Sequence, residues 1–303
     1  MNPTEQRAAM ERLTPWIQKY GSLVGHGPGA PKKHGPCEMV KFKTGHDLCG
    51  PPPPQPCVFF SFGINDDPSF DISLAERWQC RGFAADPTVH HPSKLHPLVT
   101  FHNIGLTMLS DNEERIIDKG GTEDWWFASV PGLAKLLNVQ HLDVLKIDCE
   151  GCEIAFTRDI LAEDPTFLHR VDQVSMETHV TKTWINSTEA AYYFGLQFPL
   201  LEQAGFRMEW SSIFGCSKRH EVTGCMPIFE GTPDGIHDAD PATQGLNWKF
   251  PCGHKPWPGH PNVVRGRSCH EYTWKRYPDA ATRPPAPPFL SPEDERLAQP
   301  ELI

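Results

Sequence analysis

The hexapeptide LDVLKI at residues 142–147, together with the acidic segment that follows it, constrains the fold of this chain most strongly. A short apolar run that ends in polar residues is typical of a strand buried on both faces of a parallel sheet. From residue 57 onward, similar runs alternate with stretches that have helical spacing. This alternation predicts an α/β domain in which helices cover both faces of a mostly parallel sheet.

The same patterns give the individual elements. We predict strands at residues 58–62, 81–85, 98–102, 142–147, 171–177 and 206–213, and helices at residues 70–78, 129–138 and 198–204. Two segments compete for the last strand, residues 225–230 and residues 269–276, and we prefer the second. This choice leaves residues 214–267 as an insertion far longer than an ordinary loop, which could lie over the substrate.

Proline-rich segments mark the ends of this domain. An N-terminal helix is predicted where apolar residues recur at helical spacing between Met10 and Tyr20. A stretch rich in Gly and Pro follows and ends in four consecutive prolines, which cannot be helix or central strand. We therefore predict a helix and Pro-rich linker at residues 1–56, the main domain at residues 57–277 and a Pro-rich tail at residues 278–303.

The composition limits the class of partner. The 303 residues carry a formal net charge of -10, so we expect a small-molecule or glycan partner and no nucleic acid. No apolar run approaches the roughly 20 residues that cross a bilayer, and the N-terminus lacks the layout of a signal peptide. The expected location is the cytoplasm by default, or the secretory lumen or extracellular space if a leader has been removed.

Two residues that follow predicted strands suggest a nucleotide-like ligand. In an open parallel sheet, ligands bind beyond the carboxyl ends of the strands. Gly63 allows a tight turn after the first strand, and Asp86 follows the second strand at the interval expected for an acid that binds ribose hydroxyls. No G-x-G-x-x-G follows the first strand, which disfavours a dinucleotide. S-adenosylmethionine has no phosphate and tolerates a turn with fewer glycines.

The sequence KIDCEGCE at residues 146–153 resembles the hallmark of the FkbM-type methyltransferase family. The sequences SFG at residues 61–63 and SFD at residues 69–71 resemble the branch that contains the animal methyltransferase-like proteins. Four further segments match the family in the same order: DPT at residues 86–88, NIGL at residues 103–106, ETH at residues 177–179 and, more weakly, CHE at residues 269–271. Several ordered motifs are hard to obtain by chance.

This resemblance implies a Rossmann-like class I methyltransferase with a seven-stranded, mostly parallel sheet whose last strand is antiparallel, and S-adenosylmethionine as the cofactor. It puts Gly63 beside the methionine part and Asp86 on the ribose, and Asn103 or Ile104 would contact the adenine. The implied cofactor-binding residues are Ser61, Phe62, Gly63, Asp86, Pro87, Asn103, Ile104, Asp148 and Glu150. The last two would lie near the methionine amine or the methyl group.

The predicted catalytic residues are His179, Asp148 and Glu177. Methyl transfer from a sulfonium needs a nucleophile in line with the methyl carbon, and an alcohol must lose its proton as it attacks. His179 is the predicted base because its ordinary pKa is near neutral and its strand ends beside the reactive end of the cofactor, where Glu177 could orient it. A histidine at a strand end can also be structural, and Glu153 is expected to cap the next helix.

Ten cysteines permit disulfides, but the sequence predicts no particular pairing. Cys149 and Cys152 have the C-x-x-C spacing of redox motifs. A thioredoxin-type pair, however, lies at the start of a helix after the first strands of a different motif, so we interpret this pair as incidental packing. Cysteines and histidines of the 214–267 insertion could form a zinc site, but no pair has the spacing of structural zinc modules. We therefore expect no metal.

The predicted function is transfer of the methyl group of S-adenosylmethionine to a hydroxyl of a small metabolite or glycan. One alternative is a metal-dependent hydrolase with Asp148, Glu150 and His179 as ligands, although the core has no second histidine-rich ligand motif. The other alternative is a non-catalytic binding module that keeps the cofactor fold.

Overall fold

A computed structural model describes residues 2–23, 32–42, 44–51, 53–54, 56–109, 125–180, 184–185, 187–214, 240–246, 248, 253–257, 260–267 and 269–279. Within these ranges, the side chains of residues 213–214, 253–257 and 260–267 are not described. Most of the cysteines and histidines considered for a zinc site in the insertion, and the Pro-rich tail after residue 279, lie outside the described part of the chain.

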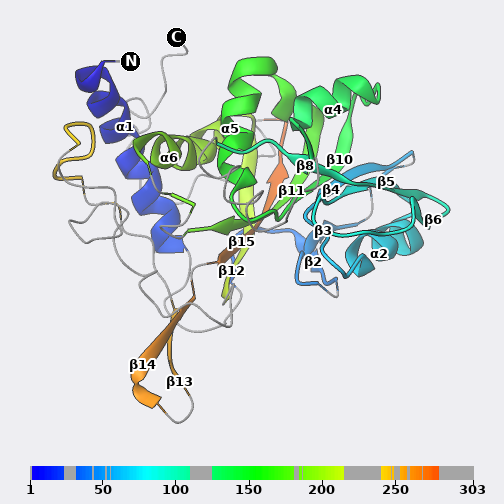
Figure 1. The fold of residues 1–303 in the computed structure, drawn as a ribbon. Helices are drawn as coiled ribbons and strands as arrows, with labels where there is room; N and C mark the ends of the chain where they lie inside the picture. The colour runs from blue at the N-terminus through cyan, green and yellow to red at the C-terminus, as the bar shows by residue number, and fades with distance from the viewer. Residues whose placement is uncertain are drawn as a thin grey trace.

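A nine-stranded sheet forms the centre of the protein (Figure 1). The seven expected strands make up its middle: β4 (Val58–Phe62), β5 (Arg81–Ala85), β7 (Val99–His102), β10 (Leu142–Ile147), β11 (Val171–His179), β12 (Phe206–Phe214) and β15 (Cys269–Arg276). Two short strands, β1 (Lys32–Lys33) and β6 (Lys94–His96), extend the sheet at its edges. The predicted count of seven is therefore wrong, because strands this short carry no apolar period.

The strand order is β1-β12-β15-β11-β10-β4-β5-β7-β6. β4, β5, β7, β10 and β11 run parallel to one another, whereas β15 is antiparallel to both β11 and β12. The preferred segment at residues 269–276 thus supplies an antiparallel last strand. From β4 the chain first builds the sheet toward β5 and β7 and later toward β10 and β11. The order reverses between β4 and β10, which is where a ligand site is expected.

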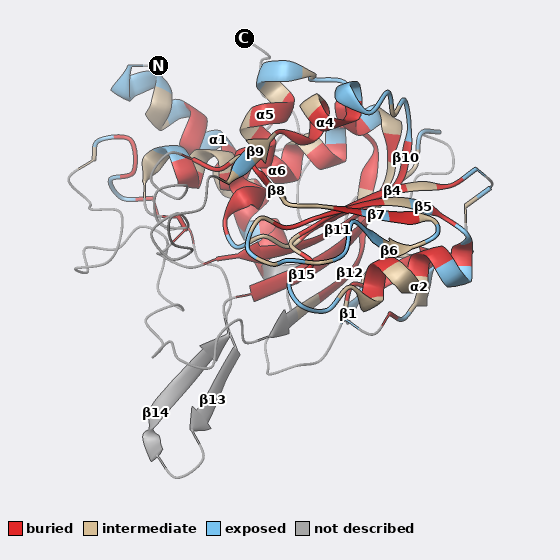
Figure 2. Cartoon of the chain, turned by 45° about the vertical axis from the view of Figure 1, so that its right-hand side comes forward, coloured by how far each residue is buried: buried red, intermediate tan, exposed pale blue. Residues whose placement is uncertain are grey.

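Helices cover both faces of the sheet (Figure 1). On one face lie α1 (Pro3–Leu23), α4 (Val130–Leu136), α5 (Cys152–Glu163) and α6 (Thr188–Gln203), and on the other lies α2 (Ser69–Trp78). Successive side chains of a strand point to opposite faces of the sheet. Phe60 and Phe62 of β4 join the core under α4, α5 and α6, whereas Phe59 joins the core under α2. Figure 2 shows that the central strands are buried by these two layers.

One helix differs from its prediction. α6 begins at Thr188, well before the predicted start at residue 198, and the Ser187 side chain caps it by accepting a backbone hydrogen bond at 3.1 Å. The first half was missed because two partly exposed tyrosines interrupt its apolar period. α6 packs against α1, where Lys19 Nζ donates to Glu202 Oε1 at 2.6 Å. The ion pair is buried and fixes the N-terminal helix to the domain.

The segment before β4 is also packed against the sheet. β2 (Glu38–Val40) and β3 (Leu48–Gly50) form a hairpin that the Cys37–Cys49 disulfide closes. The side-chain amide of Gln173 on β11 binds both backbone groups of Cys49, at 2.8 and 2.9 Å. The loop between β2 and β3 is therefore held against the central strands. The domain boundary at residue 57 stays a prediction.

Two small sheets and one short helix complete the described elements. β8 (Ile104–Leu106) pairs with β9 (Trp126–Ala128), and β13 (Gly253–Trp257) pairs with β14 (His260–Arg267) within the expected insertion. The 3-10 helix η1 (Phe167–Arg170) leads into β11. In the described part of the chain, no helix combines the length and the apolar character that crossing a membrane requires.

Candidate active site

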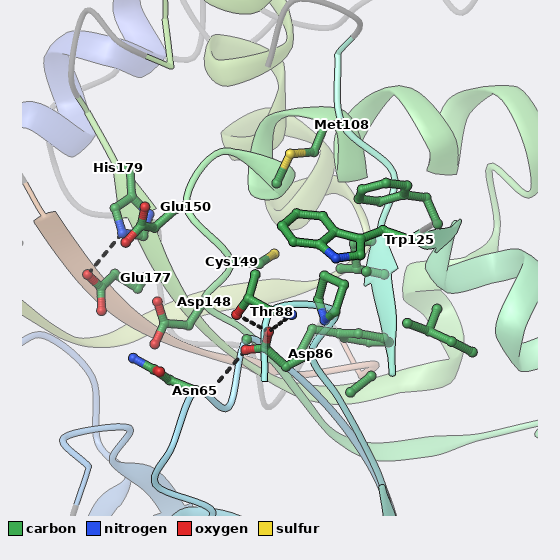
Figure 3. A pocket seen from close by; sticks show the side chains of 18 of the residues that line it. Asn65, Asp86, Thr88, Met108, Trp125, Asp148, Cys149, Glu150, Glu177 and His179 are labelled. Carbon is green, nitrogen blue, oxygen red and sulfur yellow. Dashed lines mark hydrogen bonds and ion pairs between the residues drawn. The ribbon is translucent and has the colours of Figure 1, made fainter. Parts of the chain in front are cut away.

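A cavity of about 650 Å³ opens at the carboxyl ends of the central parallel strands (Figure 3). It lies where the strand order reverses, between β4 and β10, and extends over β5 and the β8–β9 pair. Figure 3 shows Trp125 and Met108 at one end and Glu177 and His179 at the other. The cavity therefore has an apolar, aromatic end and an end that carries carboxylates.

Gly63 turns the chain immediately after β4. Its φ is +71°, and a Cβ atom at this position would collide with the backbone carbonyl of Asp148. The two strand ends are also joined by a hydrogen bond of 3.1 Å from the Asp148 amide to the Phe62 carbonyl. Both the left-handed φ and the close contact exclude a side chain, so the turn requires glycine. Gly63 lines the cavity, as its predicted role demands.

Asp86 follows β5 and organises the loop on that side of the cavity. Its Oδ1 accepts hydrogen bonds from the amide and the hydroxyl of Thr88, at 2.8 and 2.6 Å, and its Oδ2 accepts one from the Asn65 amide at 2.9 Å. The carboxylate lines the cavity with Pro87 beside it. Each carboxylate oxygen has two lone pairs, so Asp86 keeps acceptor capacity for a ligand hydroxyl.

The apolar end of the cavity is formed by the β8–β9 pair. Ile104 on β8 and the rings of Trp125 and Phe127 line it, a set of surfaces that suits a flat aromatic group. Asn103, which was predicted with Ile104 to contact the adenine, does not line the cavity. Its side-chain amide donates to the Val89 carbonyl at 2.8 Å and stabilises the neighbouring loop.

Asp148 follows β10 and stands between the cavity and the buried interior. His46 Nε2 lies 3.2 Å and Lys146 Nζ 3.5 Å from its Oδ2. Burial raises the pKa of this carboxyl, but the charge of Lys146 and the hydrogen bond with His46 outweigh burial and hold the pKa well below its usual range. Lys146 also donates to the Gly63 carbonyl at 2.7 Å, so one buried ammonium connects the two strand ends.

His179 lies between two carboxylates and has no free ring nitrogen. Its Nδ1 is 3.0 Å from Glu153 Oε1 and its Nε2 is 3.3 Å from Glu177 Oε1. Burial lowers the pKa of His179, but the charges of Glu153 and Glu177 outweigh burial and hold it well above its usual value. A protonated imidazole that donates from both nitrogens does not fit the role of base that its position predicted.

Glu153 holds the start of α5 in place. It is fully buried and accepts hydrogen bonds from the backbone amides of Gly151 and His179, at 2.8 and 2.7 Å. Gly151 is the residue that precedes the first turn of α5. The contacts fit the structural role expected of Glu153, and they join that helix start to the end of β11.

Two glutamates on neighbouring strands form the buried part of the acidic end. Glu177 on β11 and Glu271 on β15 are paired directly across the sheet. Burial raises the pKa of Glu177. Burial, followed by the charge of Glu177, raises the pKa of Glu271 to about 9. Glu271 Oε1 lies 3.6 Å from His46 Nδ1 and has no hydrogen-bond partner among the described residues.

Glu150 is the exposed carboxylate of the acidic end. It lines the cavity and makes no hydrogen bond or ion pair within the described part of the chain. Its φ is +50°, a left-handed conformation that costs a non-glycine residue about 1–2 kcal/mol. Strain of this kind at a cavity wall is typical of functional residues.

Cys149 and Cys152 are joined as a disulfide, with their Cα atoms 5.6 Å apart. The interpretation of this pair as incidental packing is therefore wrong. The positive φ angles of Glu150 and Gly151 fold the intervening chain back on itself and bring the two cysteines together. Cys149 lines the cavity and Cys152 is the first residue of α5, so the bridge lies at the wall of the site.

The cavity collects most of the residues that the sequence predicted. All predicted cofactor-binding residues except Ser61 and Asn103 line it, and so do the three predicted catalytic residues. Ser61 is buried within β4. The sequence analysis missed His46, Lys146 and Trp125. Lys146 stands inside the motif at residues 146–153 and could have been found there, whereas the other two lie in segments without any periodic signal.

A comparison with family models identifies the domain. A model described as a methyltransferase domain matches residues 24–210, which is more than half of the chain and includes β4, β5, β10 and β11. Searches of the curated proteins and of the solved structures found no significant match. The match does not specify the FkbM branch, and it favours a methyltransferase over a hydrolase. The chain therefore belongs to a family of methyltransferase domains, which supports methyltransferase activity.

Proposed function

We propose that this chain is an S-adenosylmethionine-dependent methyltransferase, of the FkbM type, that methylates a hydroxyl group of a small metabolite or glycan. The observation that carries the proposal is the cavity at the carboxyl ends of β4, β5 and β10 in a chain of the methyltransferase domain family. S-adenosylmethionine consists of an adenine, a ribose and a methionine with a sulfonium centre. The cavity offers a matching surface for each of these parts.

The proposed orientation of the cofactor follows from the two ends of the cavity. The adenine would lie between Ile104 and Trp125, at the apolar, aromatic end of the cavity. The ribose hydroxyls would donate to Asp86. The methionine part would then pass the turn at Gly63, and the sulfonium would face Asp148 and its neighbours. The positive sulfonium is favoured at this acidic end of the cavity.

The proposed reaction needs few groups from the protein. The methyl group moves from sulfur to the acceptor oxygen, the electron pair of the broken bond stays on sulfur, and the hydroxyl proton must leave. We assign the proton to Glu150, because its carboxylate lines the cavity without a partner in the described chain. His179, held by Glu153, would position Glu177 beside the acceptor.

The charge of the cavity supports an uncharged acceptor. No lysine or arginine of the described chain lines it, whereas Asp86, Asp148, Glu150 and Glu177 do. Carboxylates repel phosphorylated and other anionic acceptors. A neutral polyol or sugar hydroxyl meets no such penalty, and its proton has several acceptors within reach.

The described disulfides support an oxidising compartment. Cys37–Cys49, Cys57–Cys80 and Cys149–Cys152 are all bonded. Disulfides persist in secretory and extracellular surroundings and are rare in the reducing cytosol. We therefore propose the secretory lumen or the extracellular space rather than the cytoplasm.

The experiment is a calorimetric titration of the oxidised protein with S-adenosylmethionine and S-adenosylhomocysteine. Wild type should bind both, and Asp86→Asn should weaken binding at least tenfold, about 1.4 kcal/mol. The matched control is Asp67→Asn, because Asp67 also accepts a backbone hydrogen bond, from Ser69 at the start of α2, but does not line the cavity. A screen of hydroxylated metabolites and free glycans for release of S-adenosylhomocysteine then identifies the acceptor. Absence of binding by folded wild-type protein would rule the proposal out.

A further inference from the structure

The buried acidic end of the cavity contains a set of side chains that suits a metal ion. His46, Asp148 and Glu177 each offer one donor atom, and the three atoms lie within 4.8 Å of one another. His46 Nε2 and Asp148 Oδ2 are 3.2 Å apart. Ligands at right angles around an ion with bonds near 2.1 Å are separated by about 3 Å. The spacing is therefore already close to that of a coordinated pair.

The three donors come from elements that are fixed independently. Asp148 follows β10 and Glu177 lies on β11, two neighbouring strands in parallel register. His46 comes from the β2–β3 loop, which the Cys37–Cys49 disulfide closes. The Thr273 hydroxyl on β15 binds the carbonyl of the residue after His46. The donor set is thus arranged before any ligand arrives, as precise metal sites require.

The Nδ1 atom of His46, on the side of the ring away from Asp148, has the kind of contacts that orient a metal-binding histidine. This atom lies 3.0 Å from the Ser175 hydroxyl and 3.6 Å from Glu271 Oε1. Glu271 is 4% exposed, and this oxygen has no hydrogen-bond partner in the described structure. A carboxylate or hydroxyl at one ring nitrogen fixes the tautomer and leaves the other nitrogen free for the metal. Here the other nitrogen is Nε2, which lies 3.2 Å from Asp148 Oδ2, and a cation bound between these two atoms would replace their hydrogen bond.

Two cations of the protein already lie in this cluster, Lys146 beside Asp148 and His179 beside Glu177. Lys146 is the one lysine or arginine of the described chain whose charge acts on both Asp148 and Glu271. Its ammonium is shared with two backbone carbonyls after β4, which keep it on the side of the turn. A divalent ion between His46, Asp148 and Glu177 would add to these cations, so its binding depends on the three donor atoms rather than on an excess of negative charge.

We propose that His46, Asp148 and Glu177 bind one divalent cation of the Mn²⁺ type at the end of the cavity. One nitrogen and two carboxylate oxygens suit such an ion. This ligand set is not the set of the hydrolase hypothesis, which named Asp148, Glu150 and His179. No metal was expected from the sequence, because nothing in it marked His46 as part of the site. Asp148 and Glu177 lie at the cavity wall (Figure 3), so an ion held by them would be accessible from the cavity.

Under the proposed function, this cation defines the acceptor. A hydroxyl oxygen that binds a divalent cation loses its proton more readily and is held in a fixed direction. A ligand with two adjacent hydroxyls can fill two coordination positions at once. The site would therefore favour vicinal diols, and the hydroxyl that faces the sulfonium would receive the methyl group. Its proton would pass to Glu150 and then to solvent.

The test is a titration of chelator-treated protein with Mn²⁺, followed by calorimetry and by loss of the free-ion signal in electron paramagnetic resonance. Wild type should bind one ion, and His46→Gln and Glu177→Gln should each weaken binding at least tenfold. The matched control is His169→Gln, because His169 is exposed on η1 and belongs to none of the clusters of metal-ligating side chains in the described chain. This control should bind Mn²⁺ as wild type does.

Two further measurements separate the outcomes. Pulsed resonance of Mn²⁺-loaded wild type should detect one coordinated histidine nitrogen, which needs no variant to fold. The same samples are titrated with S-adenosylhomocysteine, so that loss of cofactor binding and loss of metal binding are observed independently. Absence of bound Mn²⁺ at millimolar concentration, or equal binding by wild type and His46→Gln, would overturn the metal site without affecting the cofactor proposal.

Discussion

Substitution of Gly63 by alanine tests the close approach of β4 and β10 on which the site depends. Gly63 and Gly245 both have φ of +71°, but a Cβ atom at residue 63 would collide with the Asp148 carbonyl, whereas nothing lies within 4 Å of one at residue 245. The two alanine variants therefore carry the same backbone strain and differ in the collision. Their comparison isolates the contact between the strand ends.

The magnitude follows from these two contributions. Left-handed φ costs alanine about 1–2 kcal/mol, and forcing an extra carbon into packed surroundings costs about 1–3 kcal/mol. Gly245→Ala should show only the first cost, and Gly63→Ala should show both. The difference corresponds to a melting temperature roughly 2–12 °C lower for Gly63→Ala than for Gly245→Ala. Displacement of Asp148 should also weaken S-adenosylhomocysteine binding at least tenfold in Gly63→Ala alone.

The assay combines urea denaturation of both variants with calorimetric titration of S-adenosylhomocysteine. Equal free energies of unfolding for Gly63→Ala and Gly245→Ala would refute the reasoning, because the collision would then have no energetic consequence. Equal loss of stability together with unchanged cofactor affinity would further show that the ends of β4 and β10 do not need to be this close.

Three more predictions concern burial, cross-linking and the apolar end of the cavity. Burial raises the pKa of Asp71 to about 6. The protonated carboxyl group of Asp71 therefore stabilises the fold fully below pH 3.8, and this stabilisation is lost as the pH rises through 6. In urea denaturation, the free energy of unfolding of Asp71→Asn should rise by about 1–2 kcal/mol relative to that of wild type between pH 5 and pH 8. The Cys57–Cys80 bridge spans 23 residues; the double serine variant should lose about 3 kcal/mol against oxidised wild type and nothing against reduced wild type. Trp125 lines the cavity and Trp126 is 75% exposed, so Trp125→Ala should weaken S-adenosylhomocysteine binding at least fivefold while Trp126→Ala leaves it unchanged; equal effects of the two would contradict the proposed adenine position.

The central strands were predictable because their burial leaves a direct mark on the sequence. β10 is buried at every position and appears as a continuous short run, and the ends of β4 and β5 follow from similar runs, whereas β11 extends two residues beyond its predicted end. The edge strands β1 and β6 could not be predicted, since two or three residues at the rim of a sheet need no apolar period. The early start of α6 was missed for a related reason: its partly exposed tyrosines blur the helical pattern.

The positions of the site residues were more predictable than their roles. Gly63, Asp86 and Asp148 follow strands, so topology alone brings them to one end of the sheet. The state of His179 depends on Glu153, which is close in space but belongs to another element. The ordinary pKa of a histidine suggested a base. Two carboxylate neighbours, which periodicity cannot reveal, make it a hydrogen-bond donor at both ring nitrogens.

The contribution of the N-terminal segment has a broader consequence for how this domain forms its site. His46 reaches Asp148 across 102 positions of sequence, and no local pattern around it marks a functional residue. The contact exists because the Cys37–Cys49 disulfide and the Gln173 amide hold the β2–β3 hairpin on the sheet. A residue in a segment rich in Gly and Pro can thus be ordered as well as one on a strand, provided that cross-links replace the missing apolar contacts. The acidic end of the cavity therefore contacts a residue that precedes the first central strand, and we expect reduction of the Cys37–Cys49 bridge to weaken the hold on His46.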